Sequence, residues 1–229
     1  MRQTRLGKAK MTNKICRLEQ QLCNIQAALK RFEQQHMITD EILALFEHQQ
    51  NIKRELSLLK GQETAVPFDF PYPWDTGAPL PHVISNGFRT ILIYYIGEHN
   101  SAWEAGRHKI TDLKTEHDDI TALVEFRHCY IYKFGGINDE VIYAHPLSDH
   151  GLEAYGAHVV VNSAWIKEQE KINSVHSNYS REFWDKRKHY IFTFHDEIFE
   201  CIADDFVVEV FKGRISTVFA EASGRLFLH

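Results

Sequence analysis

Two runs of apolar residues at heptad spacing constrain the N-terminal part of this chain more than any other feature does. The first run alternates steps of three and four positions: Ile15, Leu18, Leu22, Ile25, Leu29 and Phe32. The second run has the same spacing with one polar member: Ile42, Leu45, Gln49, Ile52, Leu56 and Leu59. This spacing places the apolar side chains along one stripe of a helix, which is typical of helices that pack in pairs.

A break in register separates the two runs. Extending the first run by sevens would require apolar residues where the sequence has His36 and Thr39. Thr39 and Asp40 are both favourable N-cap residues, so a turn is expected just before them. We therefore predict an antiparallel, coiled-coil-like helical hairpin over residues 12–61. The alternative is one long bent helix that pairs with a second chain, and the spacing alone leaves both open.

Residues 62–82 have a different composition. They contain five of the six prolines of the chain, at positions 67, 71, 73, 79 and 81, interleaved with the aromatic residues Phe68, Phe70, Tyr72 and Trp74. Proline restricts its own backbone and that of the preceding residue to extended conformations. A freely mobile linker would not carry four aromatic side chains. We expect this linker to pack on the following domain, and the alternative is that its aromatic residues line a ligand groove.

Residues 83–229 carry strand and turn signals. The predicted strands are Thr90–Ile96, Leu123–Phe134, Glu140–His145, His158–Val161, His189–His195, Phe199–Ala203 and Phe206–Phe211, with a weaker one at Ile215–Phe219. The strands within 189–211 are so close in sequence that short turns must join them, which predicts an antiparallel meander. Helices are predicted within 163–173 and 180–187, and a polar surface excursion at 98–120. The expected fold is α+β, with a mainly antiparallel β domain and two inserted helices.

Composition excludes some classes of function. The net charge of −5 does not favour nucleic-acid binding. The longest apolar run, 91–96, is too short for a membrane span. Residues 1–11 carry four basic side chains and predict a disordered leader, or residues that precede the natural start of the protein. The four cysteines form no CxxC pair and no secretion signal is visible, so we expect a cytoplasmic protein with free thiols.

Fourteen histidines are many for 229 residues, so a metal site has to be considered. No HExxH, CxxC or HxH motif occurs, and a site would have to assemble across strands. The candidate ligands, suited to zinc or iron, are His145, His150, His195, Asp196 and Cys201. In that interpretation Glu200 or Asp149 would act as the catalytic base. The alternative for each histidine is a structural role, and we assign no cofactor.

Polar side chains at the ends of predicted strands define a candidate binding pocket. Residues 189–201 combine His, Asp, Glu and Cys, and residues 138–152 form a second concentration of polar groups. The candidate pocket residues are Trp74, Asp139, His145, His176, His195 and Asp196. Cys201 shares a strand face with Phe199, so its thiol is expected to be buried.

Several strings resemble those of a family of uncharacterised bacterial proteins. They are WDTGAP at 74–79, NDE at 138–140 with HPL at 145–147, INSVH at 172–176, and FTFHD at 192–196 with FEC at 199–201. The resemblance covers residues 70–205 and leaves out the hairpin. It implies that these strings belong to one unit, and it brings no activity, cofactor or fold.

The sequence therefore favours a cytoplasmic binding or interaction protein. Residues 12–60 would mediate self-association or docking of a protein partner, and the α+β domain would present an aromatic and histidine-rich pocket. A small-molecule ligand is compatible with this pocket. The alternative is a metal-dependent, hydrolase-like enzyme that uses the His and Asp cluster. The sequence specifies neither substrate nor partner.

Overall fold

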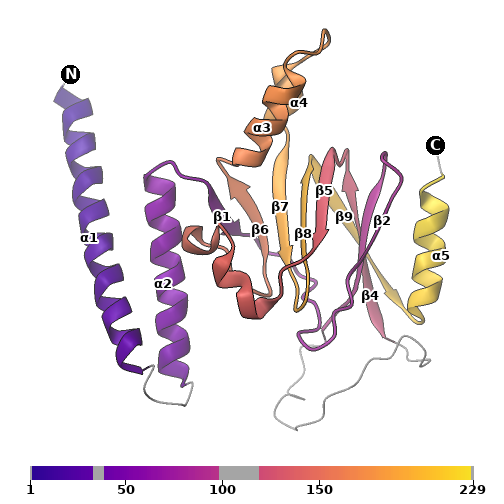
Figure 1. The fold of residues 1–229 in the computed structure, drawn as a ribbon, viewed down its shortest axis with the longest axis horizontal. Helices are drawn as coiled ribbons and strands as arrows, with labels where there is room; N and C mark the ends of the chain where they lie inside the picture. The colour runs from indigo at the N-terminus through magenta and orange to yellow at the C-terminus, as the bar shows by residue number, and fades with distance from the viewer. Residues whose placement is uncertain (1, 33–38, 98–118, 228–229) are drawn as a thin grey trace. The chain divides into compact units, whose positions relative to one another are not determined.

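The computed structural model describes residues 2–32, 39–97 and 119–227, with side chains from residue 9 onward. The chain divides into two compact units, each built from more than one segment (Figure 1). The first unit comprises Met1–Val66, Tyr143–Glu153 and Val160–Ser163, and the second comprises Pro67–Ile142, Ala154–Val159 and Ala164–His229. The predicted division was different, because it placed everything after residue 82 in one contiguous domain.

A helix pair dominates the first unit. Helix α1 (Arg2–Phe32) and helix α2 (Asp40–Leu59) run in opposite directions and contact each other (Figure 1). Their shared core contains the predicted apolar residues of both runs, Leu18, Ile25, Leu29, Ile42, Ile52 and Leu56 being buried. Thr39 caps α2, since its hydroxyl oxygen accepts a hydrogen bond from the amide of Ile42 at 3.4 Å. The predicted hairpin is confirmed, and its two apolar stripes pack within one chain.

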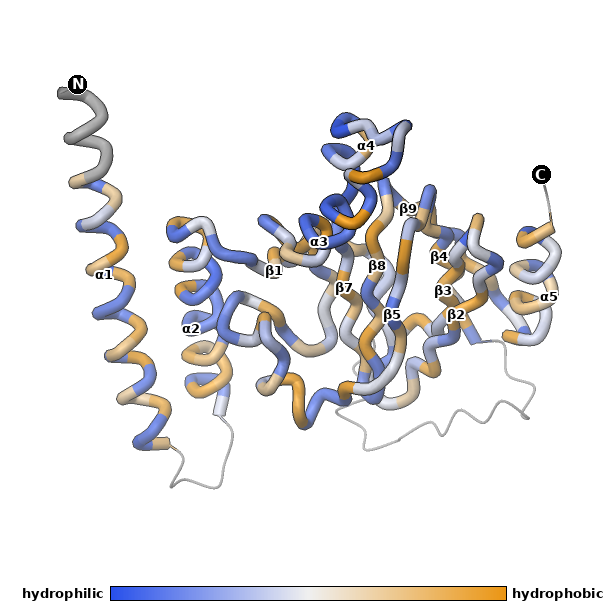
Figure 2. Tube along the Cα trace, turned by 45° about the horizontal axis from the view of Figure 1, so that its top comes forward, coloured by the Kyte–Doolittle hydropathy of each residue, from blue (hydrophilic) through white to orange (hydrophobic). Residues whose placement is uncertain are grey.

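Helix α1 begins at Arg2. The basic residues of the predicted leader over 1–11 lie within the span of this helix. Figure 2 shows apolar and polar residues alternating along the coloured part of α1, which is the helical periodicity that the prediction used.

A short segment within the same unit is fixed to α2. It contains the 3₁₀ helix η3 (Ser148–His150), where His150 Nδ1 lies 2.8 Å from Ser57 Oγ. Arg54 donates to the carbonyl of Gly151 at 3.3 Å. Gly151 has φ +91°, and a Cβ there would lie 2.6 Å from the carbonyl oxygen of Ala65. Only glycine fits this close approach without moving the backbone.

The strands form two sheets, and every pair with an assigned register is antiparallel. One sheet has the order β1-β6-β7-β8-β5: β1 (Thr64–Pro67), β6 (Ala157–Val161), β7 (Lys188–Thr193), β8 (Ile198–Ala203) and β5 (Ile131–Gly135). The other has the order β2-β3-β4-β9: β2 (His82–Ser85), β3 (Thr90–Tyr95), β4 (Ile120–Arg127) and β9 (Asp205–Lys212). The remaining helices are η2 (Asp139–Ala144), α3 (Ala164–Asn173), α4 (Arg181–Asp185) and α5 (Ile215–Arg225). The α+β fold is as predicted.

Aromatic side chains fill the core of the second unit. Along β7 and β8 alternate residues point into it, among them Phe192 and Phe199. Phe68, Phe70 and Trp74 of the proline-rich segment pack in the same core. A second apolar cluster joins α5 to the sheet that contains β3 and β4. Figure 1 shows α5 beside this sheet at the C-terminal end of the chain.

Three predicted strands were wrong. The single strand predicted at Leu123–Phe134 is two strands, β4 and β5, in different sheets, and His128 between them has φ +50°. Glu140–His145 falls largely in the 3₁₀ helix η2. Ile215–Phe219 belongs to helix α5, where Ile215, Val218 and Ala222 are buried at helical spacing. There, the spacing of apolar residues outweighs the strand preference of Ile, Val and Phe.

The predicted meander was also wrong in its last strand. β7 and β8 pair as a hairpin, but β9 pairs with β4 in the other sheet. The chain changes sheet at Asp204, whose amide donates to the carbonyl of Arg127 at 3.1 Å. Strands β1 and β2 were not predicted. The expected surface excursion at 98–120 falls almost entirely outside the described residues.

Candidate functional site

Asp139 and His195 are brought together by two turns of the second unit. The chain leaves β5 through Gly135 and Gly136, which both have positive φ, and Asp139 then opens η2. The amide of Asp139 donates to the carbonyl of His195 at 2.9 Å. His195 itself stands in the β7–β8 turn, which is closed by the hydrogen bond from Phe194 N–H to the carbonyl of Glu197.

Tyr155 completes the group from a third loop. Its backbone is left-handed, with φ +54°. The next residue, Gly156, is tied to β7 because its amide donates to Thr193 Oγ1 at 2.8 Å and its carbonyl accepts from Thr193 N–H at 3.1 Å. These bonds hold the phenol ring nearly parallel to the imidazole of His195, with ring centroids 6.3 Å apart. The Asp139–Tyr155–His195 site is thus positioned by three backbone anchors.

The site is linked by hydrogen bonds through Asp139 Oδ2, while Asp139 Oδ1 is buried without a hydrogen-bond partner. The Tyr155 hydroxyl donates to Asp139 Oδ2 and lies 2.9 Å from His195 Nδ1. His195 Nδ1 is also 3.1 Å from Asp139 Oδ2. The bond from Tyr155 and the proximity of His195 lower the pKa of Asp139. Burial and the bond to Asp139 raise the pKa of Tyr155 well above its usual value.

These bonds determine which nitrogen of His195 carries a proton. Asp139 is ionised, so its oxygens only accept, and Tyr155 uses its single hydrogen on Asp139. The Nδ1 atom of His195 can bond to either neighbour only as a donor. In the neutral ring the lone pair therefore lies on Nε2. The side chain of His195 is 39% exposed, so the site stands at a rim where this nitrogen can accept a hydrogen bond or a proton.

Other predicted pocket residues of the second unit have different surroundings. Trp74 is buried in the aromatic core, with its ring centroid 4.7 Å from that of Phe194, so it supports the turn that carries His195. Asp196 is exposed, and its charge helps to raise the pKa of Tyr155. His176 follows α3, where its Nδ1 accepts from the amide of Asn178 at 3.1 Å.

The predicted residues of the first unit have structural partners. His145 Nδ1 accepts from the amide of Leu147 at 3.1 Å, and His150 bonds to Ser57. Asp149 forms an ion pair with Lys53 at 2.8 Å. Hydrogen bonds and an ion pair to Lys53 lower the pKa of Asp149, so its carboxylate already balances a cation.

The remaining metal candidates also have partners. Cys201 is buried in the aromatic core, in the same cluster as Cys129. Glu200 lies 2.9 Å from His189 Nε2 and 3.6 Å from Lys133 Nζ. Among the residues that the structure describes, no three His, Cys, Asp or Glu side chains are grouped so as to hold a metal ion.

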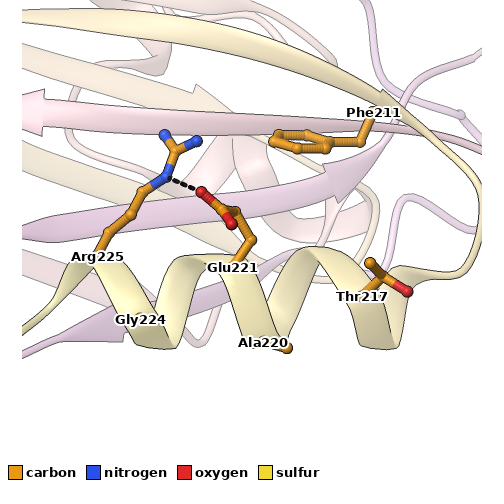
Figure 3. A pocket seen from close by; sticks show the side chains of 6 residues that line it. All are labelled: Phe211, Thr217, Ala220, Glu221, Gly224 and Arg225. Atoms are coloured by element: carbon orange, nitrogen blue, oxygen red, sulfur yellow. Dashed lines mark hydrogen bonds and ion pairs between the residues drawn. The ribbon is translucent and has the colours of Figure 1, made fainter.

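An open depression of about 500 Å³ lies along α5 (Figure 3). Phe211 forms one wall of it, and Thr217, Ala220 and Gly224 belong to the helix. Its one cation, Arg225, is paired with Glu209 through two bonds of 2.5 and 2.7 Å and with Glu221 at 3.0 Å. None of the predicted site residues lines this depression, and its charges are already balanced.

Sequence reasoning missed Tyr155 and the pairing of His189 with Glu200. Nothing in the sequence marked Tyr155, since its role depends on a left-handed turn. The pairing could have been found. A turn at 195–196 sets Phe192 opposite Phe199, which makes His189 and Glu200 diagonal neighbours on one face.

The function of this site has to be inferred from its own geometry, because similarity to known proteins does not supply one. In the described part of the chain, no helix is both long and apolar enough to cross a membrane. No family model, curated protein or solved structure matches this chain.

Proposed function

We propose that this chain is an interaction protein whose helical hairpin provides the contact surface for a second polypeptide. The observation that carries the proposal is a pair of exposed apolar side chains on α2. Leu43 is 56% exposed and Phe46 is 50% exposed. Residues three apart on a helix lie on the same surface, so the two side chains form one patch.

The patch is separate from the surfaces that α2 already uses. One stripe of α2 packs on α1 through Ile42, Ile52 and Leu56. The C-terminal half of the helix holds the η3 segment through Ser57 and Lys53. Covering the exposed halves of a Leu and a Phe side chain contributes about 1–2 kcal/mol each. This contribution would offset part of the free-energy cost of associating with a second polypeptide.

The test measures assembly state with the patch removed. Sedimentation velocity over a wide concentration range compares the full chain with the Leu43→Asp/Phe46→Asp double variant. The chain is expected to assemble with itself or with a co-purifying polypeptide, and the double variant is expected to be monomeric with unchanged helix content. Ala44→Asp, at an exposed position between the two, is the matched control and should assemble normally. A monomer that binds no polypeptide would contradict the proposal.

Changes in the buried stripe would not test docking. Leu56 packs against α1 within the same chain, so an acidic residue there would disrupt the hairpin itself. Loss of assembly in such a variant would report unfolding. The exposed patch avoids this ambiguity.

The Asp139–Tyr155–His195 site supports the second part of the proposal, a small polar ligand at the rim of the β unit. His195 offers an acceptor nitrogen, and the ionised Asp139 favours a ligand with hydrogen-bond donors. A thermal-shift screen of small polar amines and alcohols is the measurement. Any ligand that stabilises the chain should lose its effect in His195→Phe and keep it in His176→Phe.

A metal-dependent enzyme is the second candidate. The observation in its favour is the 3.1 Å approach of Asp139 Oδ2 and His195 Nδ1, two groups that bind metals elsewhere. Elemental mass spectrometry of protein purified without chelators tests it. Near-stoichiometric zinc or iron that disappears in His195→Ala would favour the enzyme over the interaction protein.

A further inference from the structure

Two cysteines of the β unit, Cys129 and Cys201, pack in one cluster near the connection between β4 and β5. Cys129 lies between β4 and β5, directly after His128, and its side chain is partly exposed. Cys201 lies on β8 and is fully buried. Both side chains pack in the same aromatic cluster, where the two thiols are close enough for each to shift the pKa of the other. One thiol is therefore accessible and the other is held against it.

The buried side chain of Arg187 lies beside this pair of cysteines, and one of its hydrogen-bond donors has no partner. The side chain of Arg187 is 3% exposed and donates to the carbonyl of His128, the residue before Cys129. It forms an ion pair with Asp204 at 3.3 Å. Its Nε atom is buried and has no hydrogen-bond partner. A buried guanidinium with an unfilled donor next to a thiol provides a site for negative charge.

The two sulfur atoms differ in protonation. The thiol of Cys201, followed by the Thr90 hydroxyl and by the charge of Arg187, lowers the pKa of Cys129 to about 7 against the opposing effect of burial. Burial and the neighbouring Cys129 raise the pKa of Cys201 well above its usual value. Cys129 is thus the more readily ionised of the two thiols.

We propose that Cys129 is a peroxide-reactive thiol and that Cys201 is its resolving thiol. In the first step the Cys129 thiolate attacks one oxygen of hydrogen peroxide, the O–O bond breaks, and the sulfenic acid forms with release of hydroxide, which takes up a proton to give water. In the second step the Cys201 sulfur attacks the sulfenic sulfur, the S–O bond breaks, and the disulfide forms with loss of water. Two thiols are oxidised, and one peroxide is reduced to two waters.

The expected rate advantage follows from two opposing effects. At pH 7 a thiol of pKa 7 is about half thiolate, against about 1% for a thiol of pKa 9, which is roughly a fiftyfold gain. A lower pKa also weakens the nucleophile, by roughly eightfold over two units. The net expectation is that Cys129 reacts roughly fivefold faster than an ordinary exposed thiol.

The experiment uses the full chain and its own cysteines as controls. The reduced protein is treated with hydrogen peroxide at pH 7, quenched with an alkylating agent and mapped by peptide mass spectrometry. Cys16 and Cys23 are exposed on α1 and provide the internal comparison. We expect a Cys129–Cys201 disulfide to form faster than Cys16 or Cys23 is oxidised. Cys129 that is oxidised no faster than those two, or that forms no link to Cys201, would overturn the proposal.

Two variants separate the roles of the pair. In Cys201→Ser the disulfide cannot form, and a 1,3-diketone probe should trap the sulfenic acid on Cys129. In Arg187→Met the oxidation of Cys129 should slow, with circular dichroism showing whether the fold is kept. If Arg187→Met does not fold, the pH dependence of alkylation at Cys129 in the unmodified chain decides instead. A midpoint near 7 supports the proposal, and one near 9 overturns it.

Discussion

The two units differ in how completely they bury their cores. In the β unit the largest side chains, such as Phe192 and Phe199, are entirely inaccessible. In the helix pair each residue of the shared core keeps part of its surface exposed, from 3% at Ile52 to 9% at Leu29. Two helices can shield only one stripe of each other, whereas two sheets enclose a layer between them. We infer that the β unit provides most of the stability and that the hairpin provides surface for contacts.

The strongest test of this difference is a cavity in the β core. Phe192 is fully buried and contacts Phe70, Trp74, Phe126, Phe199 and Phe206. Phe192→Ala should lower the free energy of unfolding by about 3–5 kcal/mol, because the ring contacts are lost and the cavity cannot fully collapse. Urea denaturation followed by near-ultraviolet circular dichroism measures the change. Phe88→Ala, at an 87% exposed position, should alter stability by less than about 0.5 kcal/mol. Equal effects would show that the two positions do not differ as described.

A matching cavity in the hairpin should cost less. Ile52 is buried between α1 and α2, and Ile52→Ala should destabilise the helix pair by about 2–3 kcal/mol. Hydrogen exchange should show faster exchange of α1 and α2 amides, with the amides of β7 and β8 unchanged. Glu47→Ala, at an exposed position of α2, is the control. Exchange that rises equally in the β strands would mean that the two units unfold together, which contradicts separate cores.

The smallest effect is expected at the polar rim of the β unit. The folded state lowers the pKa of Asp139 below its usual value of 3.8. Its contribution to stability is therefore fully present above that value and is lost as the pH falls through the lowered pKa. Asp139→Asn should reduce stability at neutral pH by about 1 kcal/mol or less, since the site is partly exposed. The difference between the two proteins should shrink in acid.

Urea denaturation at several pH values measures this effect. Asp69→Asn, at an exposed position of the same unit, controls for the change in net charge. A difference between Asp139→Asn and the unmodified chain that persists at low pH would show that the carboxylate does not stabilise the fold through its charge.

The predictions that were confirmed depend on patterns of residues that are close together in the sequence. The apolar stripes of α1 and α2, and the cap at Thr39, depend on residues three or four apart, and such residues meet in any helix. The prediction of one strand over 123–134 failed because this stretch contains no Gly, Pro, Asn or Asp that would indicate a turn. Nothing in it marks His128 as the left-handed residue where the chain passes from one sheet to the other.

The candidate site also shows that sequence patterns do not predict which segments meet in the fold. Asp139 and His195 were both selected because each lies in a concentration of polar side chains. Their contact depends on η2 and the β7–β8 turn being adjacent, and Tyr155 joins them only through a left-handed backbone. His145 and His150 looked equally suitable in sequence, yet they lie in the first unit.

The sequence by itself determined the two apolar helical stripes, the α+β class and the side of each strand that is apolar. These properties follow from periodicity, because a helix or strand fixes the direction of each side chain locally. Only the tertiary structure decided that β9 pairs with β4, that Cys129 meets Cys201, and that Tyr155 completes the site. An alternating strand can pair with several partners, and the choice depends on burying the whole aromatic core at once.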